Sequence, residues 1–134
     1  MGEVMEDKLI IDVKTFVEMF VSISYLQEQR MFNSENIRVY IRKNHGANLD
    51  DYDFYYYQLF NELDSTIDDM TEKGIISKID GNLYFITDKI NYKEIINNNH
   101  HALADMTEVF YNIYGGKDKK VSLVTSNSSK KNTR

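Results

Sequence analysis

The stretch from Leu59 to Thr87 constrains the fold more than any other part of the chain. It begins with apolar residues at spacings of four, four and three, which share one face of an α-helix: Leu59, Leu63, Ile67 and Met70. Gly74 follows this stripe, and glycine takes the left-handed conformation that ends many helices without strain. The sequence therefore predicts a helix that stops at Gly74.

Two short apolar runs follow this helix, at 75–79 and 83–87, and they flank the dipeptide Asp80-Gly81. An aspartate-glycine pair between such runs is a strong hairpin signal, because we expect both turn positions to require a positive φ. The region after Gly74 is therefore predicted to be a tight β-hairpin.

Three helices are predicted before the hairpin. The first spans 9 to about 30 and carries an apolar stripe at spacings of four and three: Leu9, Val13, Phe16, Phe20 and Ile23. The second spans 35–44, with Ser34 as its N-cap and Ile37 and Ile41 facing inward. The third spans 52–73 and contains the central stripe, and a break near Asn61 is left open.

A final helix is predicted over 91–114, and its apolar face has the spacing of a coiled coil. The residues of this seam alternate at four and three: Tyr92, Ile96, Asn99, Leu103, Met106, Phe110 and Ile113. A single asparagine in such a seam commonly fixes register and partner number. The pattern favours a homodimer formed through this helix; the alternative is that the stripe packs on its own domain.

Composition and charge limit the class of protein. The 134 residues are 42% hydrophobic, which is enough for one real core, and the lack of cysteine excludes disulfides and cysteine-based zinc sites. The most apolar stretch, Phe16–Leu26, is too short and too polar to span a bilayer, and no signal-peptide pattern is evident at the amino terminus. We expect a soluble, cytoplasmic protein that does not enter a membrane.

The net charge of −5 is unevenly distributed. Residues 117–134 hold six lysines and arginines against one aspartate, so the first 116 residues are strongly acidic. We therefore expect one domain over 1–116 and a basic, disordered tail over 117–134.

The sequence carries no sign of catalysis. It has no glycine-rich phosphate loop, no His-Glu-x-x-His motif and no serine or threonine in a nucleophile setting. His101 and Asp105 lie one helical turn apart, but two ligands make a weak metal site. We expect no enzyme, no metal and no cofactor.

The order helix, glycine, strand, tight turn and strand resembles MarR/PadR-type winged-helix proteins. The resemblance covers residues 34–89 and depends on the phrase Lys73-Gly74-Ile75 at the end of the helix and on Ile86-Thr87 at the end of the second strand. It implies an α+β, mainly α fold: a winged helix-turn-helix with long N- and C-terminal dimerisation helices. It also implies a homodimer that places two recognition helices in successive major grooves of double-stranded DNA.

The resemblance implies a DNA-binding face built from the second helix, the third helix, the wing and the tail. The residues assigned to it are Arg38, Arg42, Lys43, Gln58, Asn61, Ser65, Thr66, Lys78, Asn82, Lys117, Lys119 and Lys120. The implied role is a transcription regulator, or a plasmid or phage accessory factor in segregation (plasmid partition), replication or transfer.

The charge of the third helix departs from this family pattern. Its second half carries four acidic residues, Asp64, Asp68, Asp69 and Glu72, which oppose binding to phosphates. The alternative function is therefore an acidic winged-helix module that contacts a protein partner, such as a phage-type inhibitor of a nucleic-acid-handling enzyme.

Overall fold

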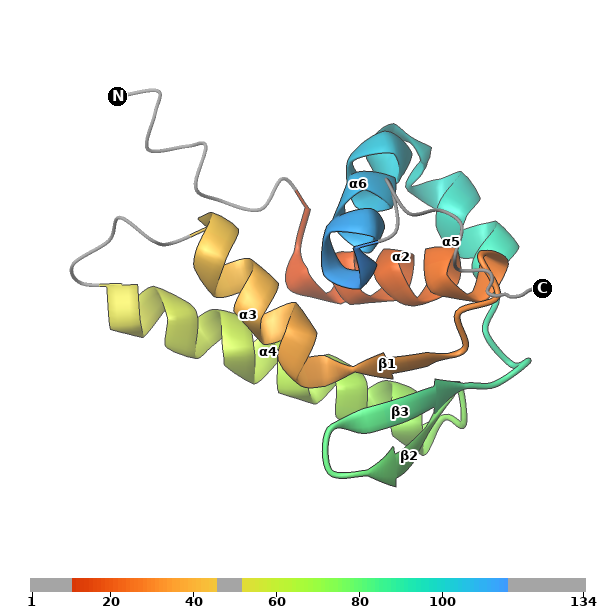
Figure 1. Cartoon of the computed structure of the whole chain (residues 1–134), viewed down its shortest axis with the longest axis horizontal. Coiled ribbons are helices and arrows are strands. Elements are labelled where there is room, and N and C mark those ends of the chain that lie inside the picture. The colour runs from red at the N-terminus through yellow and green to blue at the C-terminus, as the bar shows by residue number, and fades with distance from the viewer. Residues whose placement is uncertain (1–10, 46–51, 116–134) are drawn as a thin grey trace. The chain divides into compact units, whose positions relative to one another are not determined.

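The computed structural model describes residues 11–45 and 52–115, with the side chains of 44, 45 and 52–56 excepted. The chain is α+β and mainly helical, as predicted, with one small antiparallel sheet (Figure 1). It divides into two compact units, which are described separately here. Unit 1 comprises the residues up to Glu18 together with Met31–Ile90, and unit 2 comprises Met19–Arg30 and the residues from Asn91 onward.

Helix α2 spans Val13–Leu26, so it is shorter than the predicted helix over 9–30. Its start is set by Asp12, whose carboxylate accepts a hydrogen bond from the Thr15 backbone N–H at 2.8 Å. Hydrogen bonds from Thr15 lower the pKa of Asp12 accordingly. The chain leaves the helix through Glu28, whose φ of 62° is rare for a residue with a side chain. Leu9 lies outside the described residues.

In unit 1 the chain next forms a short strand that the sequence did not predict. Strand β1 spans Met31–Asn33, and helix α3 follows directly over Ser34–His45. The cap of α3 is Asn33 rather than Ser34, because the Asn33 Oδ1 accepts a hydrogen bond from the Glu35 N–H at 2.8 Å. Ser34 is only 3% exposed, so its side chain lies inside the fold instead of at a solvent-exposed helix end.

Helix α4 spans Tyr52–Glu72 and runs without a break at Asn61. The predicted stripe is confirmed, because its four members are at most 8% exposed: Leu59, Leu63, Ile67 and Met70. Gly74 follows with a φ of +79°, the left-handed conformation expected of it.

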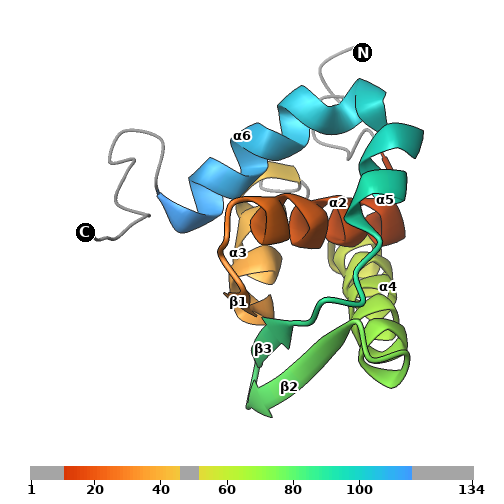
Figure 2. The same cartoon turned by 90° about the vertical axis from the view of Figure 1, so that its right-hand side faces the viewer.

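Strands β2 (Ile76–Asp80) and β3 (Leu83–Ile86) form the predicted hairpin after α4 (Figure 2). The turn is shifted by one residue from the prediction, because Asp80 pairs with Leu83 and the turn residues are Gly81 and Asn82. Gly81 has a φ of +55°, whereas Asp80 is not among the described residues with positive φ, so the expectation of two such positions at Asp80-Gly81 was wrong. Pairing also shifts between Lys78 and Asp80, which leaves one extra residue in β2.

The three strands form one antiparallel sheet in the order β1-β3-β2. The base of the hairpin is closed by Thr87, whose hydroxyl lies 2.6 Å from the Gly74 carbonyl oxygen and 2.9 Å from that of Ile75. At the other end, the Ser34 N–H donates to the Asn82 carbonyl at 2.9 Å, which ties the turn to the start of α3. The hairpin is thus fixed at both ends within unit 1.

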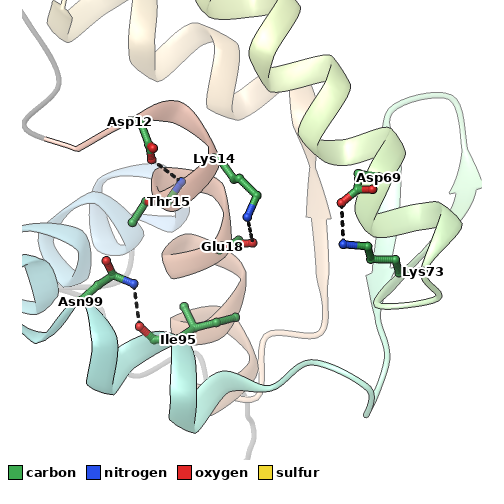
Figure 3. A network of polar contacts seen from close by, with 8 residues as sticks. All are labelled: Asp12, Lys14, Thr15, Glu18, Asp69, Lys73, Ile95 and Asn99. Atoms are coloured by element: carbon green, nitrogen blue, oxygen red, sulfur yellow. Dashed lines mark hydrogen bonds and ion pairs between the residues drawn. The ribbon is translucent and has the colours of Figure 1, made fainter.

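In unit 2 the predicted helix over 91–114 is interrupted. It consists of α5 (Tyr92–Asn98), a 3₁₀ turn η1 (His100–Ala102) and α6 (Leu103–Tyr114), and α5 and α6 meet at a bend (Figure 2). Asn99 has φ −128° and ψ 34°, outside the helical region, and its side-chain amide donates to the Ile95 carbonyl at 2.8 Å (Figure 3). The prediction of one continuous coiled-coil helix was therefore wrong.

Two residues of the predicted seam lie in the interior, since Met106 is 2% and Phe110 is 1% exposed. The Phe110 ring centroid lies 6.4 Å from that of Phe20 in α2. The remaining seam residues are half-buried: Tyr92, Ile96, Asn99, Leu103 and Ile113. Met106 and Phe110, in the second half of the seam, thus contribute to the core of unit 2.

Candidate nucleic-acid interface

Most of the residues predicted to contact DNA lie at the surface of unit 1, on α3, α4 and the hairpin. The exposed ones are Arg42, Lys43, Gln58, Asn61, Ser65, Lys78 and Asn82. The tail residues Lys117, Lys119 and Lys120 lie outside the described residues. Two predicted residues, Thr66 and Arg38, differ from the exposed set.

The prediction that Thr66 contacts DNA was wrong. Its side chain is only 9% exposed, so it cannot serve as a contact on the helix surface. The reason is its position in the helix: it follows Leu63 by three residues and precedes Met70 by four, and both are buried. Ser65, one position earlier, lies on the exposed side.

Arg38 is held between α3 and α4 instead of pointing freely into solvent. One of its terminal nitrogens contacts the Asp64 carboxylate, and its Nε lies 3.6 Å from a Glu35 carboxylate oxygen. The guanidinium also lies over the Phe60 ring, 5.4 Å from its centroid, and the guanidinium of Arg42 lies 5.2 Å from the same centroid. One aromatic ring thus supports two arginines, and one of the two is partly neutralised.

The exposed face of α4 changes character along its length. Asn61, Ser65, Asp68 and Glu72 follow one another at spacings of four, three and four and are all exposed, so they form one surface stripe. Its first half is uncharged and its second half is acidic. The whole helix carries six carboxylates and no lysine or arginine.

The first basic residue after α4 does not offset this charge. The Lys73 ammonium lies 3.1 Å from the Asp69 carboxylate, four positions earlier (Figure 3). Both side chains are largely exposed, so this pair contributes only about 0–1 kcal/mol to stability. The second half of the stripe therefore presents a negative surface.

The negative charge of α4 affects the pKa of Tyr84, a buried residue of β3. It is 7% exposed and stacks on Phe32, with ring centroids 5.6 Å apart. Burial raises the pKa of the Tyr84 phenol, and Asp68 and Asp64 raise it further, whereas Arg38 lowers it. The carboxylates of α4 thus outweigh Arg38 at this position.

Sequence reasoning missed Phe60 and Tyr84, which organise this face. Phe60 follows the buried Leu59. The signal for its role was the pair of arginines at i and i+4 on α3, which offer two cations to one aromatic side chain. Tyr84 follows the alternation of β3, where it is buried between the half-buried Leu83 and the exposed Phe85. That alternation was available in the sequence.

Two surface hollows are lined by residues that the structure describes. One of about 340 Å³ in unit 1 is lined by Gln58, Leu59, Asn61 and Glu62, all on α4. One of about 530 Å³ in unit 2 is lined by Tyr25, Leu26, Glu28 and Arg30. The first hollow shares Asn61 with the α4 stripe, and Glu62 places a carboxylate on its wall.

Within residues 11–45 and 52–115, no three potential metal ligands come together, and no helix is long and apolar enough to cross a membrane. His101 and Asp105 are both exposed. Comparisons with protein-family models, with curated proteins and with solved structures found no match.

Proposed function

We propose that unit 1 is a winged helix that binds double-stranded DNA, in a chain that acts as a homodimer. The observation that carries this proposal is the element order α2-β1-α3-α4-β2-β3, with β1 completing the sheet β1-β3-β2. In this reading α4 is the recognition helix and the β2–β3 hairpin is the wing. The role would be that of a transcription regulator or of a plasmid or phage accessory factor.

The proposed contacts use only surface residues. On α4, the exposed uncharged residues Gln58, Asn61 and Ser65 would contact base edges, and polar side chains of this kind can read bases in a major groove. Lys43 on α3 and Lys78 on β2 would contact phosphates, which supply most of the affinity but no sequence information. The dimer contacts would come from half-buried residues of the last helices, such as Ile96 and Ile113.

A binding series across salt concentrations tests this function. Full-length protein is titrated into labelled genomic DNA fragments, and the slope of log K against log salt is measured. Lys78→Gln is expected to make the slope shallower by about 0.9 per protomer, or about 1.8 for the homodimer, because each copy loses one phosphate contact. Lys93→Gln, an exposed change in α5 of unit 2, is the control and should leave the slope unchanged. Equal slopes for the two variants would rule out a phosphate contact at Lys78.

Sequencing the fragments that remain bound shows whether the protein prefers particular DNA sequences or binds DNA non-specifically through its positive charge. Replacing Asn61 and Ser65 together by alanine should abolish the preference for particular fragments and leave the salt slope intact. A triple change of Lys117, Lys119 and Lys120 to glutamine measures the contribution of the tail. If this triple variant alone loses all binding, the winged helix is not the reader.

The acidic half of α4 favours a second candidate function, a contact with a basic protein partner. Asp68 and Glu72 are exposed, and α4 has no lysine or arginine to offset them. This function predicts negligible DNA binding even at low salt, together with salt-sensitive capture of a lysine-rich peptide. Asp68→Asn with Glu72→Gln should weaken that capture, whereas neither change would weaken DNA binding.

A further inference from the structure

Arg38 and Asp64 join α3 to α4 in the middle of the face to which DNA binding is assigned above. The Asp64 carboxylate contacts a terminal nitrogen of Arg38, across 26 positions of sequence. The Arg38 side chain is 23% exposed and that of Asp64 is 52% exposed, so both reach the surface. The Arg38 guanidinium is therefore already paired with the Asp64 carboxylate of the same chain.

We propose that Asp64 competes with DNA phosphate for Arg38 and so limits the affinity of the protein for DNA. This inference rests on the proposed function and adds to it a residue that sets affinity. Asp64 would act by occupying the guanidinium in the free protein, and it would be displaced when a phosphate arrives.

Three features of the contact favour displacement by phosphate. A guanidinium binds carboxylate and phosphate through the same fork of N–H donors, so either anion fits. The Asp64 carboxylate is 52% exposed, so water screens its side of the pair and an incoming phosphate can reach the guanidinium. The Phe60 ring lies under the Arg38 guanidinium, 5.4 Å away, so it would hold the cation in place when the carboxylate leaves.

Asp64 differs in this respect from Asp68 and Asp69, the next two carboxylates of α4. Among the described residues, Asp68 forms no ion pair, and Asp69 is paired with Lys73, which directly follows α4. Asp68 is therefore expected to repel DNA only through its charge. It provides a matched control, since it is one turn from Asp64 and carries the same charge.

The test compares Asp64→Asn with Asp68→Asn in full-length protein, by titration of labelled genomic DNA fragments at several salt concentrations. Asp64→Asn should bind more tightly than Asp68→Asn, by about two- to fivefold per protomer, because Arg38 no longer has to give up a carboxylate before it contacts phosphate. The log K against log salt slopes of the two variants should be equal, since Arg38 contacts phosphate in both complexes. In an Arg38→Gln background, the two variants should become equal.

Each outcome decides the inference. If the wild type binds but Asp64→Asn and Asp68→Asn gain affinity equally, Asp64 does not compete for Arg38 and the proposed function survives alone. If the wild type binds weakly and Asp64→Asn binds well only when Arg38 is present, the inference is supported. If no variant binds at low salt, although circular dichroism shows the wild-type helix content, the inference and the proposed function both fail.

Discussion

The rings of Phe20 and Tyr114 stack almost in parallel, with centroids 5.7 Å apart and planes 4° apart. Phe110 completes the cluster in unit 2, with its centroid 4.8 Å from that of Tyr114. Burial raises the pKa of the Tyr114 phenol far above its usual value of 10, although a hydrogen bond with Ser24 acts in the opposite direction. Unit 2 therefore contains a phenol whose neutral form is favoured by folding.

This phenol predicts a loss of stability in alkali. The folded state holds the Tyr114 proton more tightly than the unfolded state, so the stabilisation is complete below pH 10 and declines as the pH rises above it. Tyr114→Phe should keep the stack and show a smaller loss of unfolding free energy between pH 8 and pH 11 in urea titrations. A Tyr114→Phe variant that loses as much unfolding free energy as the wild type over this pH range would show that the Tyr114 phenol is not the cause.

The sequence did not predict that Tyr114 stacks on Phe20. The stripe of α4 and the role of Gly74 were predictable, because both depend on local periodicity and on backbone conformation at one position. Strand β1 was not, since three residues gain their structure by pairing with β3, about fifty positions further along the chain. The pairing of Arg38 with Asp64 was hidden for the same reason.

The break at Asn99 shows a different kind of failure. A heptad pattern continues through this position, and pattern alone cannot distinguish a helix that bends from one that does not. The local signal was the run Asn97-Asn98-Asn99, because asparagine side chains compete for backbone hydrogen bonds. The side-chain amide of Asn99 donates such a hydrogen bond to the Ile95 carbonyl.

The turn at Gly81-Asn82 was predicted one residue too early, because the shift in β2 pairing depends on its partner strand.

Thr87→Val should destabilise the hairpin. The Thr87 hydroxyl satisfies carbonyls of Gly74 and Ile75 at the base of the hairpin, and valine would leave them without this donor in a half-buried place. We expect a loss of about 1–2 kcal/mol in the unfolding free energy from urea titration. Thr87→Ser, which keeps the hydroxyl, should recover most of it. If serine and valine cost the same, the hydroxyl does not support the hairpin.

Gly74→Ala should also be destabilising, by about 1–2 kcal/mol, because a side chain is disfavoured at a φ of +79°. An added Cβ would lie 3.1 Å from the Lys89 Nζ, but that is the flexible end of a side chain and can move. Gly74→Asn should cost less than alanine, since asparagine tolerates the left-handed conformation. Thermal unfolding of the three proteins gives the order. Equal melting temperatures for alanine and glycine would show that the backbone at this position is not constrained.

The seam of the last helix separates into residues that form the core of unit 2 and residues that remain for a partner. Phe110 is 1% exposed, so Phe110→Ala should lower the unfolding free energy by about 3–5 kcal/mol. Ile113 is half-buried, and Ile113→Asp should cost less in stability but weaken a homodimer that uses this face. Sedimentation equilibrium gives the dimer affinity, and urea titration monitors folding. Glu108→Gln, an exposed change in the same helix, is the control for both measurements. A monomeric wild type, or an Ile113→Asp variant that dimerises as well as the control, would remove Ile113 from the dimer contact.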